Sequence, residues 1–144
     1  MRPFTVIALS LYLYSCGPSD QEKGETPFSL LSVGNWDLVA SAQDTVYFVD
    51  YDRILTTSGK IYAWTMQSYL EQLDNGAGSV EAYYEVDCDL FRSRPLHYNI
   101  YAQALAAGNP FNSFSTDNPE WEYPRPKSVA ETQVKSVCDY VSSD

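Results

Sequence analysis

Hydrophobic and polar residues alternate along the middle of the chain with a period of two, which is typical of β-strands. In the clearest stretch, residues 80–90, apolar side chains and Cys88 alternate with Tyr83 and acidic residues. This alternation places Cys88 on the apolar side and the acidic side chains on the opposite, solvated side. Four further strands are expected at residues 36–40, 45–49, 61–66 and 96–102. No segment between them leaves room for a crossover helix, so we expect an antiparallel sheet.

Turn-forming residues separate the expected strands. The composition of residues 50–53 favours a turn after the second strand, and residues 74–76 (Asp-Asn-Gly) favour a tight reversal before the fourth. Residues 106–126 are rich in Asn, Pro and Ser, which indicates a long loop with room for one short edge strand. Aromatic residues expected in the turns and loops are candidates for a binding surface, namely Tyr51, Phe111, Phe114 and Trp121. Alternatively, the aromatics of the long loop anchor it over a sheet edge.

A single helix is expected at the C-terminus. Ser128 and Glu131 form a capping box, and Pro126 lies just before it. Apolar residues then recur at helical spacing, at Ala130, Val134, Val137 and Val141. A helix this short is marginal alone in water, so it must dock on the apolar side of the sheet. The combination predicts an α+β fold of about five to six strands and one helix.

The first fifteen residues have the features of an export signal. A charged start is followed by about a dozen mostly apolar residues, which would reach only ~18 Å as a helix and cannot cross a ~30 Å bilayer core. Leu13, Ser15 and Cys16 resemble a bacterial lipobox, which implies that Cys16 carries the lipid, and Gly17 implies delivery to the outer membrane. Alternatively, this is an ordinary secretory signal and its cysteine is incidental. We expect a signal peptide at 1–15, a lipidated flexible tether at 16–34 and one domain at 35–144.

Assigning Cys16 to a lipid leaves Cys88 and Cys138 as an even pair in an oxidising compartment. Only one intramolecular pairing is open to them, and chain entropy gives such a disulfide roughly 4 kcal/mol. The alternative is a pair of free buried thiols. Because Cys88 points to the apolar side of its strand and Cys138 lies beside the apolar stripe of the helix, a disulfide would staple the helix across the sheet.

Composition narrows the function further. The formal net charge is -10, from 19 acidic and 9 basic residues, which argues against nucleic acid as a partner. His97 is the single histidine. Neither a nucleophile elbow nor a phosphate-binding glycine loop is present, so we expect no enzyme activity and no cofactor. Acidic residues two apart on a strand lie ~7 Å from each other, too far to share one calcium ion, so we expect no metal either.

Five short motifs in order resemble the surface-adhesin protein E family of bacterial lipoproteins. They are Trp36, the segment 47–50 (Tyr-Phe-Val-Asp), the segment 59–64 (Gly-Lys-Ile-Tyr-Ala-Trp), the segment 84–88 (Tyr-Glu-Val-Asp-Cys), and the stretch from Pro126 to Cys138. The resemblance covers about residues 35–140. It implies a curved antiparallel sheet of about six strands, with the helix disulfide-tethered to the concave face. It also implies binding of host matrix proteins.

Together these features predict a non-catalytic outer-membrane lipoprotein, held to the membrane by its N-terminal lipid, on the cell surface or on the periplasmic face. The adhesin-like version binds an extracellular protein. The alternative is a periplasm-facing envelope scaffold, or a small-ligand carrier that uses a cavity between helix and sheet.

Overall fold

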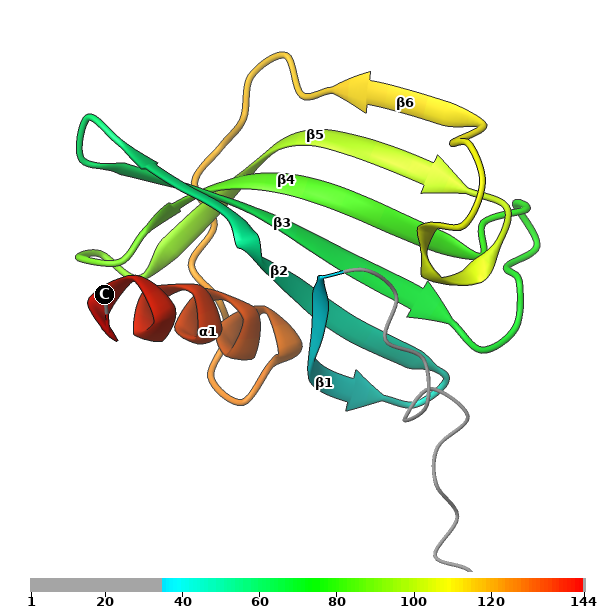
Figure 1. The fold of residues 1–144 in the computed structure, drawn as a ribbon, viewed down its shortest axis with the longest axis horizontal. Helices are drawn as coiled ribbons and strands as arrows, with labels where there is room; N and C mark the ends of the chain where they lie inside the picture. The colour runs from blue at the N-terminus through cyan, green and yellow to red at the C-terminus, as the bar shows by residue number, and fades with distance from the viewer. Residues whose placement is uncertain (1–34, 144) are drawn as a thin grey trace, which may run out of the picture.

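Six strands pair with their neighbours in chain order, and every pair is antiparallel (Figure 1). The computed structural model describes residues 35–143. The elements are β1 (Trp36–Ala42), β2 (Thr45–Thr57), β3 (Lys60–Tyr69), β4 (Ser79–Asp87), β5 (Arg92–Tyr101), the short 3₁₀ turn η1 (Ala104–Ala106), β6 (Asn112–Ser115) and α1 (Val129–Ser143). The expected antiparallel sheet, short edge strand and C-terminal helix are confirmed. The expected signal peptide, Cys16 and the tether lie outside the described residues.

The turn expected at residues 50–53 is wrong, because β2 continues through it to Thr57. The register against β3 shifts between Asp50 and Leu55, and the Asp50 carboxylate accepts the backbone N–H of Arg53 at 3.1 Å. The turn composition therefore forms an irregularity inside a strand, in the manner of a β-bulge. The hairpin closes instead at Ser58 and Gly59, whose φ angles of +51° and +73° suit a two-residue turn.

The two faces of the sheet have separate apolar clusters. On the side that carries α1, the buried residues are Val49, Ala63, Val86, Val134 and Val137. On the opposite side, η1 supplies Leu105, which packs on the buried residues Val46, Phe48 and Met66. We call these the helix-side face and the open face. On the open face, η1 covers only the cluster around Leu105, and no other element covers the rest of the face within residues 35–143.

The helix begins as its capping residues predict. The Ser128 hydroxyl accepts the N–H of Glu131 at 3.1 Å, and the Glu131 carboxylate accepts the N–H of Lys127 at 2.6 Å. Figure 1 shows α1 lying against the sheet, and most of its backbone contacts are with β1 and β2. Val134 and Val137 are its buried residues. No helix within residues 35–143 is long and apolar enough to span a membrane.

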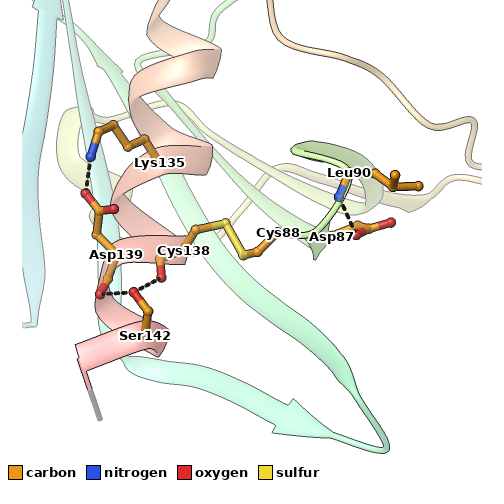
Figure 2. The surroundings of a disulfide bond; sticks show 7 residues. All are labelled: Asp87, Cys88, Leu90, Lys135, Cys138, Asp139 and Ser142. Carbon is orange, nitrogen blue, oxygen red and sulfur yellow. Dashed lines mark hydrogen bonds and ion pairs between the residues drawn. A yellow bond between two sulfur atoms is a disulfide. The ribbon is translucent and has the colours of Figure 1, made fainter.

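A disulfide joins Cys138 of α1 to Cys88 at the end of β4, which confirms the expected staple (Figure 2). The turn beside Cys88 is held by Asp87, whose carboxylate accepts the Leu90 N–H at 3.1 Å and pairs with Arg92 at 2.9 Å. These contacts, the Leu90 N–H first, lower the pKa of the Asp87 carboxyl below its usual value. The cysteine is therefore presented to the helix by a fixed turn.

The 3₁₀ turn η1 was not expected from the sequence. Leu105 and Ala106 have positive φ angles of 58° and 53°, an uncommon conformation for residues with a side chain. Their N–H groups are taken up by serine hydroxyls of the sheet, Leu105 by Ser68 at 2.9 Å and Ala106 by Ser79 at 2.8 Å. These hydrogen bonds hold the turn over one end of the open face.

Candidate functional site

The four aromatic residues expected to form one binding surface lie in three separate places. Tyr51 is in β2 rather than in a turn, and its ring stacks on Tyr140 of α1 with centroids 4.9 Å apart. It also packs against the helix-side cluster. Its position indicates that Tyr51 helps to seat the helix.

Phe111 and Phe114 lie at the β6 edge, 54% and 46% exposed. Phe114 belongs to β6 itself, and its ring centroid is 5.2 Å from that of Tyr98. Trp121 lies elsewhere, with the guanidinium groups of Arg92 and Arg94 over its ring at 4.4 and 4.5 Å. The structure therefore does not bring these residues together as one patch.

A more continuous feature crosses the open face. One row of directly paired residues runs through all six strands, from β1 to β6, and consists of Trp36, Asp50, Trp64, Tyr83, His97 and Ser115. The Trp64 and Tyr83 rings stack with centroids 4.9 Å apart, and Tyr62 stacks on Tyr83 at 5.8 Å. The Arg53 guanidinium lies over the rings of both Trp36 and Trp64, at 5.0 and 5.3 Å. We call this set the cross-strand row.

Buried carboxylates lie beneath the cations of this face. The side chains of Asp50, Glu81 and Glu85 are only 5%, 11% and 7% exposed, whereas those of Arg53 and Lys60 are 44% and 53% exposed. The expectation that the acidic side of β4 is solvated is therefore wrong for Glu81 and Glu85. A buried carboxylate is stable only when it is paired, and for Glu81 and Glu85 the pairing cations come from other strands.

Each of these carboxylates has a cationic partner. Arg53 Nε is 2.5 Å from the Asp50 carboxylate, and its Nη2 is 3.9 Å from Glu81. Arg94 donates two hydrogen bonds to Glu85 at 2.8 and 2.5 Å, and Lys60 Nζ lies 3.6 Å from the same carboxylate. The open face is thus stabilised by ion pairs, whereas the helix-side face is packed with valines.

A polar network borders the cross-strand row on β4, β5 and β6. His97 contacts Ser115 and Asn99 at 3.0 Å each, and Ser113 donates to the Asn99 carbonyl at 2.8 Å. The Asn99 amide donates to Glu81 at 3.2 Å. Because the side-chain carbonyl oxygen of Asn99 can only accept, His97 Nε2 is the donor in its contact with Asn99. These hydrogen bonds hold the four side chains in a fixed arrangement.

Tyr101 is connected to this network through the Glu81 carboxylate. Its hydroxyl donates to the Glu81 carboxylate at 2.8 Å. Burial and the neighbouring Glu81 carboxylate raise the pKa of the Tyr101 hydroxyl to about 12. Tyr101 therefore stays protonated at any physiological pH and remains a donor to Glu81.

Two kinds of site can be examined directly, a metal centre and the space between helix and sheet. Within residues 35–143, no three His, Cys, Asp or Glu side chains are grouped so that they could hold a metal ion. The cavity between helix and sheet measures about 60 Å³ and is lined partly by Ala63, Val86, Val134 and Val137. Small-molecule pockets usually measure ~300–1,000 Å³, so this one has room only for water.

Comparisons with known proteins agree with this fold. The family model for surface-adhesin protein E matches residues 36–139. A structure of Haemophilus influenzae protein E in crystal form II has a TM-score of 0.59 at 12% identity, covering 78% of this chain and 92% of that chain. Another structure of the same protein has a TM-score of 0.58 at 11% identity, covering 83% and 94%.

A structure of protein E from non-typeable Haemophilus influenzae has a TM-score of 0.55 at 10% identity, covering 79% of this chain and 82% of that chain. A comparison with curated protein sequences finds no significant match. At these identities the structural likeness concerns the fold. Because the family model spans the whole sheet and reaches the cysteine of α1, the chain belongs to the surface-adhesin protein E family.

Proposed function

We propose that this protein is an outer-membrane lipoprotein, anchored through Cys16, whose domain binds an extracellular macromolecule without catalysis. Membership of the surface-adhesin protein E family and the lipobox-like segment 13–16 support this proposal. The observation that carries it is the open face, where the cross-strand row and its exposed cations form a surface wide enough for a large partner. Six strands at ~4.8 Å spacing make that row about 24 Å long.

The open face suits binding because its side chains are already held in place. Within residues 35–143, no buried side-chain nitrogen or oxygen lacks a hydrogen-bond partner. A surface whose rotamers are fixed by ion pairs and ring stacking loses less conformational entropy when a partner docks. Tryptophan, tyrosine and arginine are also the residues that most often dominate binding energy.

The alternative of a small-ligand carrier has less support. A carrier of the kind expected would use the space between helix and sheet, and about 60 Å³ is too small for such a ligand. A periplasm-facing scaffold would have the same fold as the proposed surface protein and would differ from it only in location.

A hydrolase reading of the Ser115, His97 and Asn99 contacts also has less support. Ser115 reaches one ring nitrogen of His97, and Asn99 reaches the other. In a catalytic triad the third group is usually a carboxylate, which stabilises the imidazolium that forms during acyl transfer. A neutral Asn99 amide, which also donates to Glu81, supplies no such charge.

Location is tested by protease shaving of intact cells with detection of this domain. Loss of the domain from intact cells is expected, because the lipid would hold it on the outer surface. The matched control is Cys16→Ser, which should release the domain from the membrane fraction. Protection in intact cells, with cleavage only after the envelope is opened, would favour the periplasmic scaffold.

Binding is tested on extracellular matrix deposited by cultured cells. The full-length lipoprotein in detergent should bind it, and Tyr83→Ala should reduce the binding at least tenfold, as truncation of a central aromatic residue does. Tyr69→Ala is the matched control. Ser68 of β3 faces the open side, so the next residue, Tyr69, faces the opposite side of the sheet. Equal binding by the parent and Tyr83→Ala would argue against the open face.

A further inference from the structure

The open face is charge-balanced in a strongly acidic protein. Four cations and four carboxylates are paired on it, namely Arg53, Lys60, Arg92 and Arg94 with Asp50, Glu81, Glu85 and Asp87. The chain as a whole has a formal net charge of -10. The ion-paired charges of the open face therefore contribute nothing to the acidic excess of the protein.

This charge distribution bears on the kind of partner. A polyanion such as a sulfated polysaccharide would meet no unpaired cation on the open face and would be repelled by the rest of the protein. A polycation would be attracted to the acidic surfaces elsewhere. An uncharged partner matches a charge-balanced face, because its binding leaves every ion pair intact and strands no charge.

The ring geometry narrows the choice among uncharged partners. Arg53 covers Trp64 from the β2 side, and Tyr83 stacks on it from the β4 side. Tyr83 in turn contacts Tyr62. Arg53 and the three rings thus form one continuous stack, whereas proline-rich peptides dock in aromatic-lined grooves. The face offers ring edges and fixed polar groups instead.

Those polar groups match the chemistry of sugar hydroxyls. His97, Asn99, Ser113 and Ser115 place donors and acceptors side by side across β5 and β6, beside the edges of Trp64 and Tyr83. A hydroxyl group both donates and accepts, so it can join this network without leaving a partner unpaired. The ~4.8 Å spacing of strands is also close to the length of one hexose unit in an extended chain.

We propose that the open face binds an uncharged, hydroxyl-rich polysaccharide, laid across the strands along the cross-strand row. This inference rests on the proposed function and names the chemical class of the partner. Ring edges would contact the C–H groups of each sugar, and the network on β5 and β6 would bond the hydroxyls.

The test is an immobilised array of uncharged oligosaccharides of two to seven units, with heparin and a decaproline peptide on the same surface. The full-length lipoprotein in detergent should bind at least one uncharged series, and the signal should rise with length until the chain spans the row. Binding to heparin alone, to decaproline alone, or to nothing on the array would overturn the inference.

Two variants test whether oligosaccharides bind at the cross-strand row of the open face. Tyr83→Ala removes a ring of the row and His97→Ala removes the centre of the polar network, and each should weaken oligosaccharide binding at least tenfold. Tyr69→Ala should bind as the parent does. Circular dichroism and an intact disulfide check that each variant is folded. Retained oligosaccharide binding in both folded variants would overturn the inference.

Failure of this inference is distinguishable from failure of the proposed function. If no oligosaccharide binds but the protein still binds deposited matrix, and Tyr83→Ala abolishes that binding, the partner is not an uncharged polysaccharide and the binding role stands. If neither surface is bound, both proposals fail.

Discussion

The two faces of one sheet are stabilised in different ways. The helix-side face buries Val49, Ala63 and Val86 under the valines of α1, and a disulfide holds that helix in place. The open face buries apolar residues only where η1 covers it, and elsewhere it buries carboxylates under arginines and a lysine. The difference shows that a strand with one apolar side does not need a solvated second side. Its other side can be ordered by charge pairing and ring stacking.

This division has a consequence for function. Apolar packing with a covalent bond makes the helix-side face a rigid support. The open face keeps its polar and aromatic groups at the surface, where a partner can reach them. Breaking one component at a time on each face tests the comparison.

The largest effect is expected from the disulfide. Cys138→Ser opens a loop of 50 residues, which corresponds to about 4 kcal/mol of unfolding free energy in the chain-entropy model. Urea unfolding in oxidising buffer measures it. Cys88→Ser should lose the same amount, and the double variant should lose no more. An unchanged midpoint in Cys138→Ser would show that valine packing alone holds the helix.

The next effect concerns the ion pairs of the open face. Arg53→Ala leaves the buried Asp50 carboxylate without its cation and should cost about 1–3 kcal/mol in chemical denaturation. The matched control is Lys135→Ala, which removes the solvent-exposed pair with Asp139 on α1 and should cost less than ~0.5 kcal/mol. Equal costs would mean that burial adds nothing to the open-face pairs.

A pH-dependent effect is expected from Tyr101. Its pKa is raised to about 12 in the folded protein and is about 10 in an unfolded chain. Its contribution to stability is therefore complete below pH 10 and is lost as the pH rises from 10 to 12. Tyr101→Phe should cost about 1 kcal/mol at pH 8 and should flatten this part of the stability curve. Parallel curves for parent and variant would contradict the Glu81 contact.

The smallest effect is expected at the exposed β6 edge. Phe114→Ser removes a ring that is 46% exposed and paired mainly with Tyr98, and it should change the free energy of unfolding by less than ~0.5 kcal/mol. Thermal melting followed by circular dichroism is sufficient. A loss above 1 kcal/mol would show that β6 is a structural part of the sheet and not a peripheral edge.

Much of the fold could be predicted from local patterns. Period-two alternation located β4 and β5, the capping box of Ser128 located the start of α1, and two cysteines on converging surfaces indicated the staple. The composition of the residues after Val49 predicted a turn wrongly, because residues that favour turns also occur at bulges inside strands. The turn η1 could not be predicted from its own segment, because the serines that accept its N–H groups, Ser68 and Ser79, are distant in the chain.

The candidate site could be predicted only in part. A position in a loop was expected to mark a binding residue, yet Tyr51 and Phe114 lie in strands. Of the four candidates, Trp121 is the one that contacts open-face residues, through Arg92 and Arg94. Trp64, Tyr83 and His97 are in expected strands, and nothing in their own segments marks them as one row. Their alignment depends on register, which each strand acquires from its neighbours.

The sequence by itself determined which residues could face an apolar core, where the helix begins and which cysteines could pair, because these depend on spacing along one segment. Only the tertiary structure decided that Glu81 and Glu85 are buried and that six side chains form one row across the sheet. Burying a carboxylate requires a cation, and here Arg53 comes from a bulge two strands away and Arg94 from the adjacent strand. Such pairing depends on contacts between segments, which a local pattern does not contain.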